Sequence, residues 1–512
     1  MKQSDQLATL FAHAIWRLDP DAGSLRVQMY RQLRDAVTEG RVAPGTVLPS
    51  TRDLAAVLGV SRSTVVEALD QLRMEGYLVT RQGAATRIAA LDPIHLNNVA
   101  KRPTATEQHW EQADGSPTLG VQHWLQDDPP TPVTIRAFRP GLPDIRAFPA
   151  QVWATHLGRR ARQPASHDLS YVGHAGVSSL REQIVRHIAE TRHVVARPEQ
   201  VIVLPSAQTA FDVAMRCTLR EGDTAWVEDP GYPGIRTLLR AHKARIEPVP
   251  VDVEGLCPAG QRSRPRLIYL TPSHQYPTGT MLSLARRLEL LEVARAHGAV
   301  IIEDDFDSEF QAHGQPVASL QGLDRNGVVM YVGTFSKSLA PGLRIAYLVV
   351  PPAYVGLAET IVSGTGIGVS IHVQLAMADF MAYGELRRHI HRMNVEYSKR
   401  LRTLHRILSG AGYELILPSK LLGGLQLCIG LPEPLIDLDV VSELQSRGLV
   451  ALPLSALCHG QEWRGRQGLL LGVGLVPTDE VEPAARTLCA ALEQCSETVA
   501  RRAARRARRT PQ

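Results

Sequence analysis

The stretch TFSKSLAPGLRIAYLVV, residues 334–350, decides the fold of the larger part of this chain. It places Lys337 between two serines, directly after an apolar run, and it places Arg344 seven residues later. A lysine at the end of a strand is, by itself, most often a surface residue. The residues that follow the other predicted strands therefore decide what this lysine does.

Short apolar runs typical of buried strands recur before and after this stretch, and amphipathic helical patterns such as residues 283–298 separate them. The predicted strands are 201–204, 225–228, 267–270, 299–303, 328–332 and 345–350. Near-continuous apolar strands that alternate with helices predict an α/β fold with a mostly parallel sheet covered on both faces. Ligands of such sheets bind at the carboxyl ends of the strands.

Chemically distinctive groups follow these predicted strands. Asp304 stands at the end of one strand, and a carboxylate there is costly to bury without a cationic partner. Tyr232 follows a second strand, and Ser206, Ala207 and Gln208 open a helix whose free N–H groups suit a phosphate. An amine, an acid, an aromatic ring and a phosphate-binding turn fit pyridoxal phosphate, which a lysine holds as a Schiff base while an acid pairs with its ring nitrogen.

The N-terminal region carries a helix-turn-helix pattern. Residues 51–59 predict a short helix with Thr51 as its N-cap, and a second helix begins after the cap residue Ser61. The stretch YLVTRQGAATRIA then predicts two short strands around Gly83, which form a wing. Small hydroxyl residues and Arg62 at the start of the second helix suit contacts with DNA phosphates and base edges.

The chain divides into four predicted segments. They are a winged helix-turn-helix domain at 1–90, a linker at 91–132, an α/β domain at 133–495 and a basic tail at 496–512. The linker is predicted from its polar, proline-dotted and aperiodic composition. From about residue 385, a long helix pattern opens a smaller C-terminal α/β subdomain. The arginines of the tail suit either DNA phosphates or a solvated terminus.

The composition favours a soluble protein of the cytoplasm. The 512 residues are 44% hydrophobic and carry a formal net charge of +5, which is modest for this length. Six scattered cysteines fit no zinc pattern, so no metal is predicted and core thiols are expected. The N-terminus has no secretory signal, and no run approaches the ~18 apolar residues that cross a membrane.

Two family resemblances follow from these motifs. The region that ends in the wing resembles the winged helix of GntR-type bacterial regulators. The region from about 137 to 480 resembles fold-type I aminotransferases through FRPGLPDIRAFP, YVGHAGVSSLR, EDPGYPGIR, TPSHQYPTG, IIEDDFDSEF and TFSKSLAPGLRIAY. The combination resembles the MocR subfamily of GntR-type regulators. It implies a transcriptional regulator that binds double-stranded operator DNA as a head-to-tail homodimer and senses pyridoxal 5′-phosphate, an amine or an amino acid.

The resemblance also implies roles for individual residues. Lys337 holds the cofactor covalently, Asp304 pairs with the ring nitrogen and Tyr232 stacks on the ring. The residues implied around the phosphate are Ser206, Ala207, Gln208, Ser336 and Arg344. The residues implied to contact DNA are Arg52, Ser61, Arg62, Ser63 and Thr64, with Gln82 and Gly83 of the wing at the minor groove.

Two departures from the family pattern bear on ligand binding. Many relatives have a tyrosine where this chain has Phe306, which leaves Tyr276 or His274 to replace its hydroxyl donor. Leu470 stands where aminotransferases carry an arginine that clamps a substrate carboxylate, and Gly234 stands where one regulator of the subfamily has another. A charge-assisted pair of this kind is worth roughly 1.5–3 kcal/mol, so its loss disfavours ordinary transamination.

Two other functions stay open at the level of the sequence. One is an active aminotransferase, dependent on pyridoxal phosphate, that carries a DNA-binding domain. The other is a regulator whose cofactor pocket is empty or degenerate. Steady turnover of an amino donor and a keto acid would indicate the first, and Leu470 argues against it.

Overall fold

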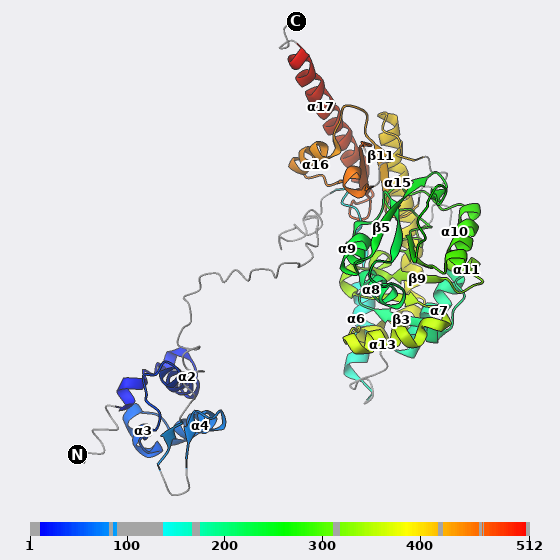
Figure 1. Ribbon diagram of the computed structural model, residues 1–512. Coiled ribbons are helices and arrows are strands. Elements are labelled where there is room, and N and C mark those ends of the chain that lie inside the picture. Colours follow the sequence, from blue (N-terminus) through cyan, green and yellow to red (C-terminus); the bar gives the residue numbers. More distant parts are fainter. Residues whose placement is uncertain are drawn as a thin grey trace. The chain divides into compact units, whose positions relative to one another are not determined.

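The computed structural model describes residues 11–80, 85–89, 137–165, 175–310, 318–417, 423–459, 463 and 465–507, the last six as backbone only. The chain forms two compact units that divide between Ser116 and Pro117 (Figure 1). Neither unit has, among its described residues, a helix long and apolar enough to cross a membrane.

The N-terminal unit is a small helical bundle with a two-stranded sheet. Its elements are η1 (Pro20–Ala22), α2 (Leu25–Thr38), α3 (Thr51–Leu58), α4 (Arg62–Met74), β1 (Leu78–Val79) and β2 (Arg87–Ile88). Strands β1 and β2 pair antiparallel, as the predicted wing requires. One apolar cluster joins the three longer helices to the strands, and it includes Leu33, Leu54, Val65, Leu72 and Ile88.

The two helices of the helix-turn-helix begin at serine caps. The hydroxyl of Ser61 accepts a hydrogen bond from the N–H of Thr64 at 3.1 Å, so α4 begins as predicted. The cap of α3 differs from the prediction, because Ser50 and not Thr51 accepts from the N–H of Asp53, at 3.2 Å. Thr51 is already the first helical residue, since the chain leaves the extended conformation one residue earlier than expected.

The larger unit is organised around an eight-stranded sheet of order β3-β10-β9-β8-β7-β4-β5-β6. The strands are β3 (Val201–Leu204), β4 (Thr224–Asp229), β5 (Arg245–Asp252), β6 (Gly255–Leu256), β7 (Leu267–Leu270), β8 (Val300–Asp305), β9 (Val329–Thr334) and β10 (Ala346–Val349). Strands β5, β4, β7, β8 and β9 are parallel, while β10 runs antiparallel to both β3 and β9. The expected mostly parallel sheet is therefore confirmed.

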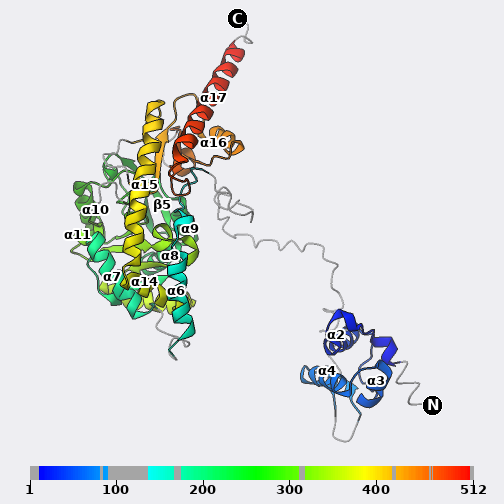
Figure 2. The same ribbon diagram turned by 180° about the vertical axis from the view of Figure 1, so that it is seen from behind.

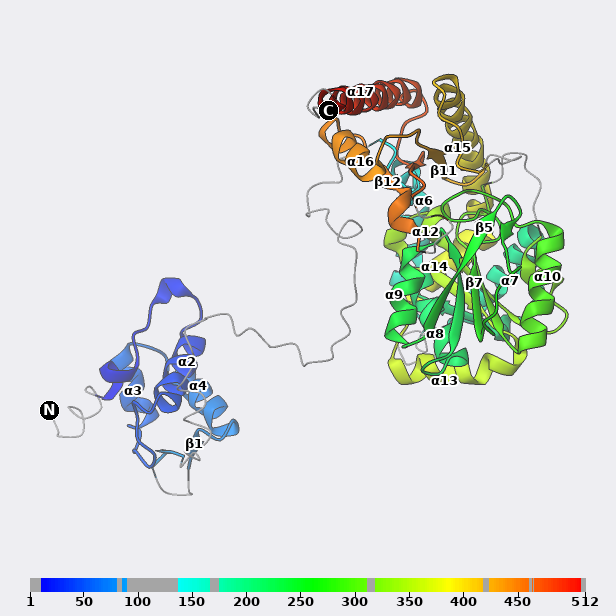
Figure 3. The same ribbon diagram turned by 45° about the horizontal axis from the view of Figure 1, so that its top comes forward.

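Helices cover both faces of this sheet (Figure 3). On one face lie α8 (Ala207–Thr218), α9 (Pro233–Ala241) and α13 (Val355–Thr365). On the other lie α6 (Ala150–Arg162), α7 (Ser178–Arg192), α10 (Leu284–His297) and α14 (Ile371–Ala382). Alternating side chains of each strand feed the two apolar layers, which is why the strands read as continuous apolar runs.

The C-terminal subdomain packs helices on a three-stranded antiparallel sheet of order β11-β13-β12. Its elements are α15 (Glu385–Gly410), β11 (Gln426–Gly430), α16 (Asp437–Ser446), β12 (Leu452–Pro453), η8 (Leu454–Leu457), β13 (Gly468–Gly472) and α17 (Val481–Ala507). Helix α15 contacts α14 of the large sheet at one end and α17 at the other (Figure 2).

Two features differ from the sequence-based expectation. Strand β5 is not among the predicted strands, and it contains Pro248 and Pro250, which disfavour a central strand. Its neighbour β6 is only two residues long, so β5 is close to an edge strand and tolerates both prolines. The predicted boundary before residue 496 falls within α17, since apolar residues such as Cys495 and Val499 keep this helix packed on the subdomain core.

Candidate cofactor site

A cavity of about 170 Å³ lies where the parallel strands end. The predicted residues that line it are Ser206, Ala207, Gln208, Tyr232, Tyr276, Asp304, Phe306, Ser336 and Lys337. The lining residues that sequence reasoning missed are Gly141, Phe211, Thr271, Thr334 and Gln426. Because β3, β4, β7, β8 and β9 point the same way, groups that follow different strands meet at one edge.

Lys337 lies on α12 (Phe335–Ser338), the single turn that follows β9. The hydroxyl of Thr334 caps this turn by accepting from the N–H of Ser336, at 3.1 Å. The Nζ of Lys337 donates a hydrogen bond to the carbonyl oxygen of Gly141. Burial lowers the pKa of the Lys337 amine, while the charges of Asp307 and Asp304 act in the opposite direction. A lysine with a lowered pKa is a better nucleophile toward a carbonyl group.

Asp304 faces the cavity from β8 and is held by a residue that sequence reasoning missed. The hydroxyl of Tyr269, on the neighbouring strand β7, donates to Oδ2 of Asp304 at 2.6 Å. Burial raises the pKa of Asp304 to about 7, although the hydrogen bond from Tyr269 acts to lower it. The sequence contained a signal for the position of Tyr269. Tyr269 follows Leu267 by two residues in a predicted strand, so both side chains lie on the same buried face of β7.

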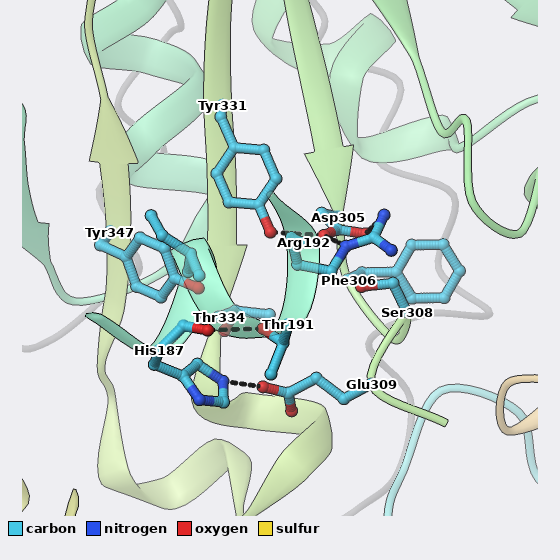
Figure 4. Close-up of a pocket in the computed structure, with 11 residues that line it drawn as sticks. His187, Thr191, Arg192, Asp305, Phe306, Ser308, Glu309, Tyr331, Thr334 and Tyr347 are labelled. Carbon is cyan, nitrogen blue, oxygen red and sulfur yellow. Dashed lines mark hydrogen bonds and ion pairs between the residues drawn. The ribbon is translucent and has the colours of Figure 1, made fainter. Parts of the chain in front are cut away.

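The next residue, Asp305, points to the opposite face of the sheet. There it forms an ion pair with Arg192 of α7, with Nε and Oδ2 2.7 Å apart, and accepts a hydrogen bond from Tyr331 (Figure 4). Close by, Nε2 of His187 lies 2.6 Å from Oε1 of Glu309. The neighbouring carboxylates of β8 therefore have different partners: Tyr269 for Asp304, and Arg192 for Asp305. The ion pair between Arg192 and Asp305 anchors α7 to the end of β8.

Tyr232 and Gln208 form one wall of the cavity. The Nε2 of Gln208 donates to the hydroxyl of Tyr232 at 2.8 Å, so the helix that follows β3 fixes the ring that follows β4. Gly234 lies beneath this pair. A Cβ at Gly234 would come within 2.1 Å of Gln208 Nε2 and 2.6 Å of Tyr232 Cε1. A side chain at this position, where the family resemblance raised the question of an arginine, would therefore have to displace Gln208 or Tyr232.

The N-terminus of α8 opens onto the same cavity. The hydroxyl of Ser206 caps the helix by accepting from the N–H of Thr209 at 3.1 Å. Ala207 and Gln208, the first two helical residues, line the cavity, and backbone N–H groups at these positions have no acceptor within the helix. Such groups and the helix dipole attract an anion such as a phosphate.

The two candidates for the missing tyrosine hydroxyl lie in different places. Tyr276 lines the cavity, with its ring edge-on to Phe306 at a centroid distance of 6.3 Å. His274 is turned away, because its Nδ1 lies 2.8 Å from Oδ1 of Asp307. Of these two residues, Tyr276 is therefore the one positioned to offer a hydroxyl to a group in this cavity.

A buried acid supports the wall near Tyr276. The hydroxyl of Thr271 donates to Oε2 of Glu228 at 2.6 Å and accepts from the N–H of Tyr276 at 2.9 Å. Burial raises the pKa of Glu228 to about 8, with the hydrogen bond from Thr271 acting in the opposite direction. Glu228 thus acts on the cavity through Thr271 and was not singled out from the sequence.

Two residues discussed from the sequence lie outside the cavity. Arg344 has an exposed side chain and is not among the residues that line it. Leu470 is fully buried in β13, in an apolar cluster with Cys428, Leu454 and Trp463. Aliphatic and aromatic side chains therefore surround Leu470.

Most of the residues predicted to contact DNA lie at the start of α4, and Arg52 lies on α3. Arg52, Ser61, Arg62 and Ser63 are exposed, and Thr64 is half-buried. The hydroxyl of Ser61 lies 2.8 Å from that of Ser63 and 2.7 Å from that of Thr64. Gln82 and Gly83 lie outside the described residues. The described part therefore presents hydroxyl and guanidinium groups at one helix N-terminus.

Two family models match the chain. The model for bacterial regulatory proteins of the gntR family matches residues 25–88, and the model for aminotransferase class I and II matches residues 148–461. The first match falls in the N-terminal unit and the second covers most of the larger one.

Two regulators match most of the chain. The probable rhizopine catabolism regulatory protein MocR of Rhizobium meliloti is 39% identical over 390 residues, which are 75% of this chain and 77% of that protein. The pyridoxine biosynthesis transcriptional regulator PdxR of Corynebacterium glutamicum is 32% identical over 454 residues, which are 88% of this chain and 92% of that protein.

Solved aminotransferases share the fold of the larger unit. The α-aminoadipate aminotransferase LysN of Thermus thermophilus, in complex with N-(5′-phosphopyridoxyl)-L-leucine, has a TM-score of 0.64 at 25% identity and covers 71% of this chain and 94% of its own. A kynurenine aminotransferase of Pyrococcus horikoshii has a TM-score of 0.62 at 23% identity, with coverages of 70% and 90%. With its gntR-type winged helix and its aminotransferase-like unit, the chain belongs to the MocR subfamily of GntR-type transcriptional regulators.

Proposed function

We propose that the larger unit binds pyridoxal 5′-phosphate through Lys337, and that the chain adjusts its binding to operator DNA in response to the cofactor or to an amine or amino acid that reaches it. One observation carries the proposal. The Lys337 amine, the Asp304 carboxylate and the N-terminus of α8 line the same cavity at the carboxyl edge of the sheet.

The residues of the cavity fit the chemical groups of this cofactor. Pyridoxal phosphate supplies an aldehyde that condenses with amines and a ring that withdraws electrons. The N-terminus of α8, with Ser206 as its cap, offers backbone donors to the phosphate. Asp304, held by Tyr269, accepts from the ring nitrogen, and Tyr232 provides a flat surface against the ring. Lys337 has the lowered pKa that attack on the aldehyde requires.

Regulation requires that the ligand distinguish two states of the protein that differ in DNA affinity. Gly141 supports such coupling, because it lines the cavity and accepts the hydrogen bond of Lys337 shortly after the predicted linker. A covalent bond at Nζ removes donors from this amine and changes its contact with Gly141. The start of the larger unit therefore responds directly to the chemistry at Lys337.

The cofactor part of the proposal is tested by absorbance. Purified full-length protein titrated with pyridoxal phosphate is expected to develop a visible band that Lys337→Ala abolishes. Lys399→Ala, an exposed lysine of α15, serves as the matched control and keeps the band. A wild-type protein that never develops the band contradicts the proposal and indicates a degenerate pocket.

The regulatory part is tested by DNA binding. Fluorescence anisotropy with the DNA upstream of the protein's own gene is expected to give different affinities with and without pyridoxal phosphate. Lys337→Ala should bind this DNA with one affinity under both conditions. Equal wild-type affinities with the cofactor and with every amine tried contradict the coupling.

Transamination is not the function that this geometry favours. Among the described residues that line the cavity, Lys337 is the only cation, so this described lining offers no second cation for a substrate carboxylate. Steady turnover of an amino donor and a keto acid by the purified protein would contradict this conclusion.

A further inference from the structure

We infer that the ligand side of this cavity selects an amine without a carboxylate, and that the regulator responds to such amines in preference to the corresponding α-amino acids. The inference rests on the proposed cofactor function, because it concerns the part of the same cavity that the cofactor leaves to a ligand. It follows from the chemistry of three walls: the small sheet, the cluster behind Tyr276 and the segment that ends at Gly141.

One face of the small sheet turns toward the cavity. Gln426 of β11 lines the cavity, and Cys428 shares its face because side chains two residues apart on a strand point the same way. Directly opposite these two residues, on β13, lie Gly472 and Leu470. Of these four residues only Gln426 lines the cavity, the other three are buried behind it, and none of the four carries a charge.

The wall at Tyr276 continues this face. The Tyr276 ring packs against the apolar cluster that contains Cys428 and Leu470. Burial raises the pKa of the Tyr276 hydroxyl, so this group is a neutral donor. A ligand beside Tyr276 therefore meets a neutral hydroxyl group, and the side chains buried behind that ring are uncharged as well.

The third wall is made of backbone. A Cβ at Gly472 would lie 2.4 Å from the carbonyl oxygen of Arg139 and 2.6 Å from Cα of Pro140, so glycine allows this segment to cross the sheet. Gly141 follows directly and lines the cavity beside Lys337. The wall beside the Lys337 amine therefore consists of backbone peptide groups.

Two of the described arginines, Arg236 and Arg344, do not line the cavity. Arg236 is buried, but its Nη1 donates to the carbonyl oxygen of Leu457 at 3.3 Å and its side chain does not line the cavity. Arg344 is exposed and also outside the lining. In the described wall a ligand carboxylate would meet neutral groups and the like charge of Asp304.

This arrangement has a measurable consequence. A carboxylate that leaves water for a site without a cationic partner loses more hydration than neutral donors return. An amine of the same shape without the carboxylate avoids this loss. We expect a preference of about tenfold or more for the amine, and tenfold corresponds to about 1.4 kcal/mol.

The test uses matched pairs of ligands on the full-length protein carrying pyridoxal phosphate, after unbound cofactor is removed. The pairs are 3-methylbutylamine with leucine, 2-phenylethylamine with phenylalanine, and ethanolamine with serine. The change in visible absorbance gives a half-saturating concentration for each compound. In every pair that responds, the amine is expected to saturate at a concentration lower by about tenfold or more. Equal or tighter binding of the amino acids, or no response to any amine, overturns the inference.

Two variants of Gln426 test whether the uncharged wall is the cause. Gln426→Arg places a cation in the cavity and is expected to reduce the preference for the amine by about tenfold or to reverse it. Gln426→Met removes the amide without adding charge and should keep the wild-type preference. Gln426 is only half-buried, so both substitutions are compatible with folding, which the cofactor band of each variant verifies. If both variants shift the preference equally, the wall charge is not the cause.

The outcome separates this inference from the proposed function. A cofactor band that is absent from the wild type refutes the cofactor proposal itself. A band that is present, lost in Lys337→Ala and more sensitive to amino acids than to amines leaves the cofactor proposal intact and refutes the ligand class alone.

Discussion

The hydroxyl of Tyr269 lies 2.6 Å from Oδ2 of Asp304, within the fully buried end of two neighbouring parallel strands. A hydrogen bond to an ionised group stabilises that ionised form, and here it opposes the large effect of burial on the pKa of Asp304. The charge that a pyridinium nitrogen requires therefore depends on a tyrosine that does not line the cavity.

Tyr269→Phe is accordingly expected to weaken cofactor binding. Loss of the donor raises the pKa of Asp304 further, and a hydrogen bond to a charged group is worth about 1.5–3 kcal/mol, so affinity for pyridoxal phosphate should fall by about tenfold or more. Absorbance titration measures this change. Tyr331→Phe, which removes a hydrogen bond to Asp305 on the opposite face, is the control. Similar losses in both variants would mean that Asp304 has no special dependence on Tyr269.

Gly234→Ala should disturb the aromatic wall. Its Cβ would come within 2.1 Å of Gln208 Nε2 and 2.6 Å of the Tyr232 ring, so one of these side chains must move. We expect an approximately tenfold loss of cofactor affinity without loss of the fold. Gly356→Ala is the matched control, because a Cβ there meets no atom within 4 Å. Unchanged affinity in Gly234→Ala would show that the Gln208–Tyr232 pair does not position the cofactor.

Glu228 should make stability depend on pH. Its pKa is about 8 in the folded protein and about 4.3 in an unfolded chain, so between these values the folded state holds the extra proton. Stability contributed by this group is therefore full below about pH 4 and is lost as the pH rises to about 8, with an upper bound of about 5 kcal/mol.

Glu228→Gln removes this loss. Urea unfolding at pH 5 and pH 8.5 measures the free energy of unfolding. Relative to the wild type, this free energy should be higher for Glu228→Gln at pH 8.5 than at pH 5. The control Glu221→Gln, at an exposed position, should show no such change. If the free energies of unfolding of Glu228→Gln and the wild type change with pH by the same amount, Glu228 is not the cause of the pH dependence.

Arg192→Met should destabilise the larger unit strongly. It leaves Asp305 as a buried carboxylate without its guanidinium partner, and breaking a buried pair in this way costs about 3–5 kcal/mol. The double variant Arg192→Met with Asp305→Asn removes both charges and should recover part of the loss. Urea unfolding at pH 7 measures both variants. A double variant as unstable as the single one would show that the charge on Asp305 is not the cause.

Arg62→Ala should weaken DNA binding without affecting the N-terminal fold. Arg62 is exposed at the N-terminus of α4, where a guanidinium group reaches a phosphate or a base edge. If it contacts a phosphate, the slope of log affinity against log salt should fall in magnitude by about one. Arg73→Ala, at the other end of α4, is expected to leave affinity and slope unchanged. Equal effects of the two variants would place the DNA contact elsewhere.

The sequence by itself determined the local elements and the order of the groups at the strand ends. Apolar runs located most strands of the large sheet, and the Ser61 cap marked the second helix of the helix-turn-helix, because both signals act between residues close in the chain. The alternation of parallel strands and helices also predicted that Asp304, Tyr232 and Lys337 would meet at one edge.

Only the tertiary structure decided which distant residues complete the site. Gly141 and Gln426 are far from Lys337 in the chain, and they reach the cavity because the small sheet packs beside the end of the large one. Tyr269 lies opposite Ile302 in the strand register and its hydroxyl reaches Asp304, while Arg344 lies outside the cavity. Such contacts depend on packing between elements, which local sequence patterns do not encode. The neutral wall at Gln426, with Leu470 buried behind it on the same sheet face, is a property of the assembled sheet, and the proposed ligand class rests on it.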